Sequence, residues 1–211
     1  AVNSMESALK ISPLDPDIHI NLGIILQDLE MLKEAELSYL KAIDIDPNLV
    51  EAHFNLGIIH KRQGRLNQAE RSYKQAIRVD PAYALAHNNL GTTLAQAGKF
   101  KEAEDCYRRA LALKPEYAEA HNNLGIALLK RGNSEEAEVS HRSALRNKRN
   151  FPEAYYNLGN ALKEQSRLDD GIEAYLSALS LDPNYLDALC NLGIIYHQQG
   201  LEFLPIFLNI L

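Results

Sequence analysis

The chain has 211 residues, of which 46% are hydrophobic, and its 22 Lys and Arg against 28 Asp and Glu give a formal net charge of −6. The apolar fraction excludes a disordered segment, and no stretch reaches the ~18–20 uncharged apolar residues that a membrane-spanning helix needs. The acidic balance argues against a general nucleic-acid-binding protein, which needs a cationic face to neutralise phosphates. We therefore expect a soluble, folded protein with neither a nucleic-acid nor a membrane partner.

The two cysteines, Cys106 and Cys190, lie far apart in the sequence. They form neither a disulfide framework nor a CxxC metal motif. The natural interpretation is a reducing compartment, the cytoplasm, with the nucleus as a further location.

One tripeptide organises the chain. Asn-Leu-Gly recurs at intervals of 34 residues, beginning at Asn21, Asn55, Asn89, Asn123, Asn157 and Asn191. Self-similarity at a fixed period of roughly 20–50 residues is typical of repeat architectures. When Pro16 is taken as position 1, the tripeptide occupies positions 6 to 8 of every repeat.

In chain order, this frame predicts a partial repeat, five complete repeats, one further helix and a tail. Residues 1–15 form the second helix of a preceding repeat, so the chain starts inside a repeat. The complete repeats are 16–49, 50–83, 84–117, 118–151 and 152–185, and the first helix of a sixth covers 186–200. Residues 201–211 leave the frame and form an atypical apolar tail.

Each repeat is predicted to form two antiparallel helices, at positions 2 to 14 and 18 to 31. Apolar residues recur there at helical spacing, Gly separates the two helices, and Pro at position 32 closes the second. A Gly inside a helix costs roughly 1 kcal/mol relative to Ala, so the Gly at position 8 needs a reason. We expect close packing, in which this Gly and the Ala residues at positions 20 and 27 let the helices approach while an aromatic residue at position 24 fills the space alongside. The fold class is therefore all-α, a solenoid of antiparallel helix pairs.

These columns resemble the tetratricopeptide repeat family, whose 34-residue helix–turn–helix unit has Leu-Gly at positions 7 and 8, Ala at 20, an aromatic residue at 24, Ala at 27 and Pro at 32. The resemblance covers about residues 1–200 and implies a right-handed superhelical scaffold. The departures are local: Arg149 replaces the Pro and Gly171 the Ala. Position 4, often Trp in the family, carries His19, His53, His87, His121, Tyr155 and Leu189.

The tail 201–211 has three interpretations. Solenoids need polar caps, because each repeat buries its apolar face only against its neighbours. An apolar tail is therefore a truncated or misread gene end, a hydrophobic segment that docks on a partner or on another copy of the chain, or an irregular cap.

The candidate binding residues lie on the first helices. Stacked helical pairs line a concave surface with their first helices, and positions 2, 5, 6, 9, 12 and 13 share one face. Asn is a poor helix-interior residue, yet it fills position 6 in all six repeats. Side-chain amides about 10 Å apart meet roughly every third residue of an extended peptide, and an amide both donates and accepts. The alternative is that these Asn residues only orient the helices.

Six side-chain amides alone would bind a peptide weakly. Specificity must come from the side chains next to them. The neighbours that we select lie at positions 5 and 9 of the first helices. Together with the Asn column, the predicted groove residues are Phe54, Asn88, Asn122, Tyr156 and Asn160.

Several other functions are disfavoured. Tetratricopeptide domains that grip chaperone tails use Lys and Arg at positions 2, 5 and 6, where this chain has acidic, apolar or amide residues. The four His at position 4 belong to separate repeats and cannot converge on one metal ion, so we expect them to serve core packing. No HExxH, GxSxG or GxGxxG motif occurs. We expect no cofactor and no catalytic activity in this segment.

Two functions remain. The first is a protein-interaction scaffold that presents an Asn-lined groove to proteins or peptides in extended form. The alternative rests on residues 157–164 and 174–183, which are similar to the substrate-recruiting arm of O-linked N-acetylglucosamine transferases. That resemblance implies a fragment that delivers polypeptides to a catalytic domain outside this chain.

Overall fold

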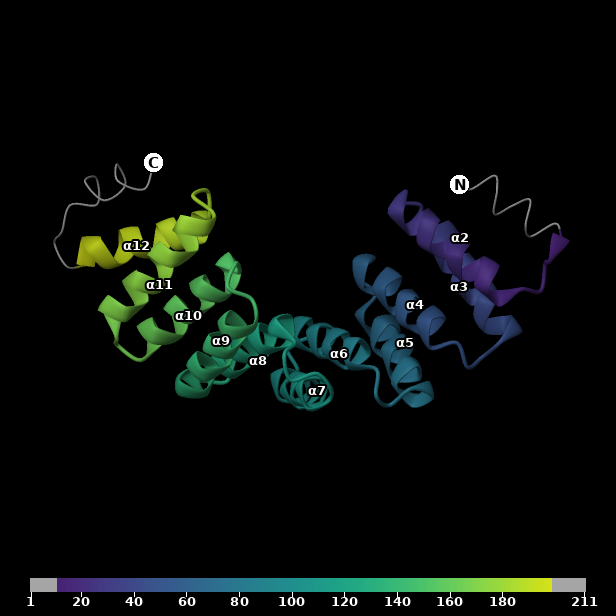
Figure 1. Ribbon diagram of the computed structural model, residues 1–211, viewed down its shortest axis with the longest axis horizontal. Helices are drawn as coiled ribbons and strands as arrows, with labels where there is room; N and C mark the ends of the chain where they lie inside the picture. The colour runs from purple at the N-terminus through teal and green to yellow at the C-terminus, as the bar shows by residue number, and fades with distance from the viewer. Residues whose placement is uncertain (1–10, 199–211) are drawn as a thin grey trace. The chain divides into compact units, whose positions relative to one another are not determined.

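The computed structural model describes residues 11–198, which form 11 helices and no strand (Figure 1). The chain clusters into two compact units that divide after Leu113. Each unit is a stack of antiparallel helix pairs, so the predicted all-α solenoid class is confirmed. The predicted tail 201–211 and most of the predicted segment 1–15 lie outside the described residues.

The N-terminal unit contains three helix pairs. They are α2 (Pro16–Asp28) with α3 (Leu32–Ile45), α4 (Val50–Arg62) with α5 (Leu66–Val79), and α6 (Ala84–Gln96) with α7 (Phe100–Leu113). The C-terminal unit contains α8 (Ala118–Lys130) with α9 (Ser134–Asn147), α10 (Pro152–Glu164) with α11 (Leu168–Leu181), and α12 (Leu186–Gln198).

Helices occupy positions 1 to 13 and 17 to 30 of each repeat, one residue earlier than the sequence predicts. In the repeats that open with Pro16 and Pro152, Pro favours this early start because it suits the first helical position. The first helix ends early because position 15 takes a left-handed backbone conformation, with φ of 73° at Gly64 and 81° at Gly132. A left-handed residue just beyond the C-cap is a common way for a helix to stop.

The Gly column at position 8 packs directly against the side chains at position 24. A Cβ atom built on Gly57 would lie 2.6 Å from Cε1 of Tyr73, whose side chain is fully buried, so a larger residue does not fit without a shift. Ala69 and Ala76, at positions 20 and 27, are fully buried as well. The predicted close packing is confirmed. The same contact joins Gly23 with Tyr39, Gly91 with Tyr107, Gly125 with His141, and Gly159 with Tyr175.

The His column at position 4 links each repeat to the residues before it. Nε2 of His53 lies 2.9 Å from the carbonyl oxygen of Pro47, which closes the preceding repeat. This carbonyl follows the end of a helix, where backbone acceptors need a partner. His19, His53 and His87 are buried, in agreement with the predicted packing role, whereas His121 is half-buried. The equivalent pairs are His19 with Pro13, His87 with Pro81 and His121 with Pro115, at 3.1, 3.0 and 2.8 Å.

Candidate functional site

The Asn column lies on first helices that are neighbours within each unit. Helix α4 contacts both α2 and α6 in the N-terminal unit, and α10 contacts α8 in the C-terminal unit. Along the column, Asn21 is exposed and Asn157 is buried. The half-buried members are Asn55, Asn89, Asn123 and Asn191.

The amides of the column differ in what they contact. Asn89 donates from Nδ2 to the carbonyl oxygen of Leu85 in its own helix, at 3.0 Å. Asn157 instead donates to Oδ1 of Asn122, at 3.2 Å, and so joins α10 to α8. The column therefore contributes to packing in the C-terminal unit in addition to presenting amides at the surface.

The predicted residues at position 5 lie mostly at the junction between helices. Phe54 is 9% exposed, and its ring contacts the rings of Tyr73 and Tyr83 at centroid distances of 5.8 and 5.1 Å. Asn88 and Asn122 are buried as well, at 6% and 1% exposure. These three side chains present little surface to a ligand.

Asn122 takes part in a polar network that depends on a substitution in its own repeat. His141 stands at position 24, where the other described repeats have Tyr, and its Nδ1 lies 3.0 Å from Oδ1 of Asn122. Burial of the imidazole lowers the pKa of His141 to about 4. The ring is therefore neutral at physiological pH, and the His141–Asn122–Asn157 cluster is a buried polar network.

Three of the predicted residues meet at one hollow of about 430 Å³ in the C-terminal unit, which we call the amide hollow. Half-buried Tyr156 and Asn160 on α10 and Asn191 on α12 form part of its lining. The other lining residues are Leu129 and Lys130 from α8, and Lys163 and Glu164 from α10.

A hydrogen-bond triangle fixes the orientation of the two amides in the amide hollow. The hydroxyl of Tyr175 donates to Oδ1 of Asn160 at 2.8 Å, and Nδ2 of Asn191 donates to the same oxygen at 2.9 Å. Nδ2 of Asn191 also lies 3.3 Å from the Tyr175 hydroxyl. This arrangement leaves the Nδ2 donor of Asn160 and the Oδ1 acceptor of Asn191 without a hydrogen bond to any described residue. One donor and one acceptor are what a peptide group requires.

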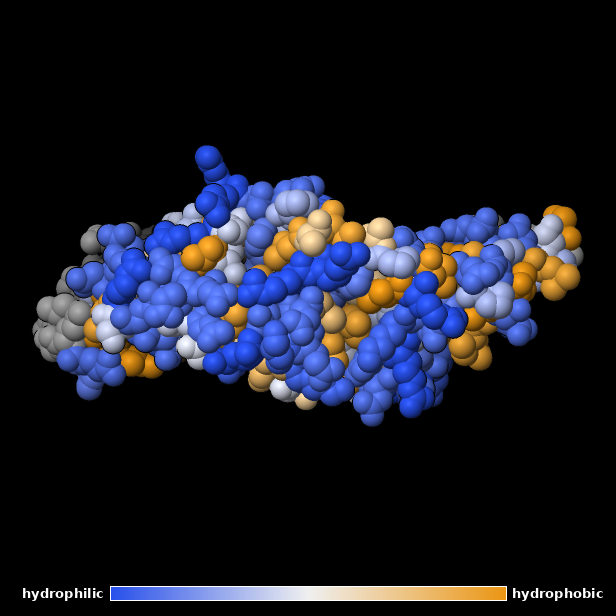
Figure 2. Space-filling model, turned by 90° about the horizontal axis from the view of Figure 1, so that it is seen from below, coloured by the Kyte–Doolittle hydropathy of each residue, from blue (hydrophilic) through white to orange (hydrophobic). Residues whose placement is uncertain are grey.

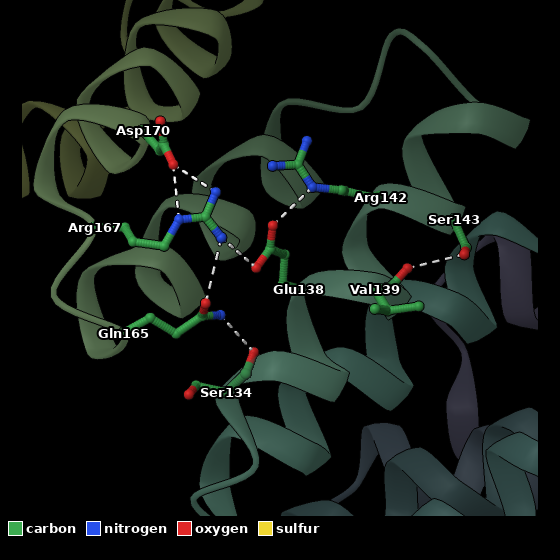
Figure 3. A network of polar contacts seen from close by, with 8 residues as sticks. All are labelled: Ser134, Glu138, Val139, Arg142, Ser143, Gln165, Arg167 and Asp170. Atoms are coloured by element: carbon green, nitrogen blue, oxygen red, sulfur yellow. Dashed lines mark hydrogen bonds and ion pairs between the residues drawn. The ribbon is translucent and has the colours of Figure 1, made fainter.

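A network of ion pairs and hydrogen bonds joins two of the three repeats whose residues line the hollow (Figure 3). Glu138 on α9 accepts hydrogen bonds from Arg142, at 3.0 Å, and from Arg167, at 2.8 Å. Arg167 precedes α11 and also pairs with Asp170. Gln165 donates to the carbonyl oxygen of Ser134 at 3.0 Å, so the contact extends from one repeat to the next.

A second surface feature is apolar. Figure 2 shows a face that is largely hydrophilic over the C-terminal helices, at left, with more apolar side chains over the N-terminal helices, at right. On α3, Leu37 and Leu40 are 60% and 44% exposed and line a hollow of about 590 Å³.

Sequence reasoning did not single out Lys130, Lys163 or Glu164. They lie at positions 12 and 13 of the first helices, one turn beyond position 9. The helical spacing places these positions on the same face as the Asn column. Each of these positions carries Lys or Arg in only two of the six repeats, so no column of recurring residues marks them.

Among the described residues, no group of three His, Cys, Asp or Glu side chains gathers as a metal site requires. None of the helices within residues 11–198 is both long enough and apolar enough to cross a lipid bilayer.

Two family models match the sequence. The model described as "Tetratricopeptide repeat" matches residues 54–116 and 89–154, and the model described as "TPR repeat" matches residues 28–64 and 159–200. A comparison with curated proteins gave no match.

Solved structures share the fold. YrrB, described as a TPR protein with an unusual peptide-binding site, has a TM-score of 0.74 and 22% identity over 90% of this chain and 98% of its own. MamA has a TM-score of 0.72 and 26% identity over 80% of this chain and 92% of its own. PilF of Pseudomonas aeruginosa has a TM-score of 0.77 and 22% identity over 88% of this chain and 86% of its own.

Proposed function

The chain belongs to the tetratricopeptide repeat family, and we propose that it is an interaction scaffold that binds protein segments in extended form along its first helices. The observation that carries this proposal is the amide hollow. There the Tyr175 hydroxyl orients two side-chain amides, so that Asn160 offers a donor and Asn191 an acceptor.

The spacing of the repeats suits an extended ligand. First helices of adjacent repeats are about 10 Å apart by usual interhelical distances, and an extended chain advances ~3.3 Å per residue. A bound strand therefore meets a new first helix roughly every third residue. Contacts to its backbone are independent of its sequence, and side chains such as Tyr156 supply selectivity.

The relatives support a protein ligand. YrrB is described as having a peptide-binding site, and it has the same fold. The hollow also has the mixture of polar and aromatic groups that peptide-binding surfaces use. We assign this segment a binding role and no catalytic role. Its two free cysteines suit a reducing compartment, the cytoplasm, with the nucleus as a further location.

Selection from a library of random linear peptides on phage tests the proposal, because it needs no known partner. We expect the full chain to enrich a set of peptides. Asn191→Ala removes the acceptor in the hollow and should weaken binding of an enriched peptide roughly 2- to 12-fold, as the loss of one net hydrogen bond implies.

The matched control is Asn184→Ala, in the exposed turn before α12, where the side-chain amide has no hydrogen bond to a described residue. It should leave affinity unchanged. Melting temperature is measured for both variants. Unchanged binding together with a large loss of stability in Asn191→Ala would mean that the column serves only to orient helices.

A sharper form of the proposal is that the chain recruits substrates for a glycosyltransferase. Its support is the similarity of residues 157–164 and 174–183 to the arm of O-linked N-acetylglucosamine transferases. Sequencing the intact transcript on both sides of these residues tests it. A catalytic domain in the same reading frame would support this form, and a stop codon directly after Leu211 would leave only the scaffold.

A further inference from the structure

We infer that the amide hollow selects extended peptides that carry an Asp or Glu side chain, which two lysines of the hollow bind. This inference rests on the proposed function and specifies the chemistry of its ligand. The lysines are Lys130, at the end of α8, and Lys163, near the end of α10.

Both lysines line the same hollow as Asn160 and Asn191, so a peptide held by the amides passes both lysine side chains. Neither Lys130 nor Lys163 forms an ion pair with another described residue. Glu164 is the one acidic side chain in the lining, and it is exposed. The lining therefore has an excess of positive charge, in a chain whose net charge is −6.

The equivalent cations of the N-terminal unit already have partners within the protein. Arg62 occupies the same repeat position as Lys130, and its guanidinium pairs with the carboxylate of Glu30. Lys61 occupies the same position as Lys163 and donates to Oγ1 of Thr92 at 3.3 Å. In the C-terminal unit these positions have no such partner, which leaves both charges for a ligand.

A carboxylate fits this surrounding better than a neutral side chain does. Two lysines in the lining attract an acidic peptide before it docks, and this attraction weakens as salt is added. The amides hold the peptide backbone while the lysines pair with a side chain, so one hollow distinguishes peptides by charge. Charged groups contribute more to selectivity and association rate than to affinity.

The peptide library tests this inference when the full chain is compared with a double variant, Lys130→Glu with Lys163→Glu. We expect the wild type to enrich Asp and Glu, and the double variant to enrich Lys and Arg. An enriched acidic peptide should lose roughly tenfold in affinity for the double variant, a change of about 1.4 kcal/mol. It should also lose affinity when its acidic residues are replaced by the corresponding amides.

The matched control is Lys33→Glu with Arg149→Glu. It makes the same change in net charge at exposed residues outside the hollow, and it should enrich the same peptides as the wild type. Circular dichroism confirms that each double variant remains helical.

The outcomes separate the two proposals. Enrichment of the same uncharged peptides by the wild type and the Lys130/Lys163 variant would overturn the charge selection and leave the scaffold function standing. Equal effects of the two double variants would also overturn it, because net charge alone would then explain the selection. Absence of any enriched peptide would count against the proposed function itself.

Discussion

At the scale of single residues, the backbone at position 15 has the same left-handed conformation whatever residue is there. Gly64, Gly98 and Gly132 have φ of 73°, 77° and 81°, whereas Glu30 and Ser166 both have φ of 60°. For a residue with a side chain, this conformation costs roughly 1–2 kcal/mol of conformational free energy, whereas Gly adopts it without that cost. The turn between the two helices of a repeat is therefore strained wherever Gly is absent.

We predict that Ser166→Gly stabilises the protein by up to about 1 kcal/mol, because it removes this strain. Gly132→Ser places the same residue in the same column of the same unit and should destabilise by a similar amount. Urea unfolding of both variants measures the change. A loss of stability in Ser166→Gly would show that the serine side chain contributes more than its backbone costs.

The buried imidazole at position 24 makes stability depend on pH. Burial lowers the pKa of His141 to about 4, whereas an unfolded His titrates near its usual value of about 6.5. Between these values the unfolded chain binds a proton that the native chain does not, so stability falls as the pH falls. His141 therefore destabilises the native state by about 2 kcal/mol at pH 5 and hardly at all at pH 7.

We predict that His141→Tyr removes this dependence. The third repeat already combines Asn88 at position 5 with Tyr107 at position 24, so the chain itself contains the replacement pair. Urea unfolding at pH 7 and pH 5 should show a smaller loss of stability in the variant than in the wild type. Equal losses would mean that His141 titrates in the native state as it does in the unfolded chain.

At the scale of helices, each repeat depends on the contact between the glycine of its first helix and the ring of its second. We predict that Gly57→Ala destabilises the protein by about 1–2 kcal/mol, because the new methyl group collides with the buried Tyr73 ring. The free-energy cost of this collision exceeds the ~1 kcal/mol that Ala gains over Gly in helix propensity. Gly193→Ala is the matched control, because no described atom lies within 4 Å of its Cβ position. It should leave the melting temperature unchanged or raise it. Equal effects at both sites would refute the packing argument.

The carboxylate of Glu138 joins one repeat to the next. Burial acts to raise the pKa of Glu138, but the side chains of Arg142, Gln165 and Arg167 together outweigh it, and the pKa lies below its usual value. A lowered carboxylate pKa stabilises the native state above the unfolded value near 4.3, and this contribution is lost as the pH falls through the native pKa.

We predict that Glu138→Gln lowers the melting temperature at pH 7 and has little effect at pH 3. Glu173→Gln on α11 is the control, because that carboxylate is exposed and forms no ion pair with a described residue. It should have little effect at either pH. A loss of equal size for Glu138→Gln at pH 7 and pH 3 would assign the effect to packing and not to charge.

At the scale of the whole molecule, the repeat frame predicts most of the fold. Helix pairs, the Gly and aromatic columns and the packing role of the His column all follow from residues that recur every 34 positions. The site is less predictable. The polar network at Asn122 depends on a His that occurs at position 24 in one described repeat. Lys130 and Lys163 stand at positions that carry Lys or Arg in only one other repeat. Such features depend on which side chains meet in three dimensions, and the period does not encode them.

The most direct test of the proposed function is to locate a bound peptide on the full chain. An enriched peptide that carries a benzophenone group is photo-crosslinked to the protein, and the adducts are mapped by mass spectrometry. We predict adducts on the first helices of the C-terminal unit, at Tyr156, Lys163 and nearby residues of α8, α10 and α12. Adducts confined to the second helices, α9 and α11, would contradict binding in the amide hollow.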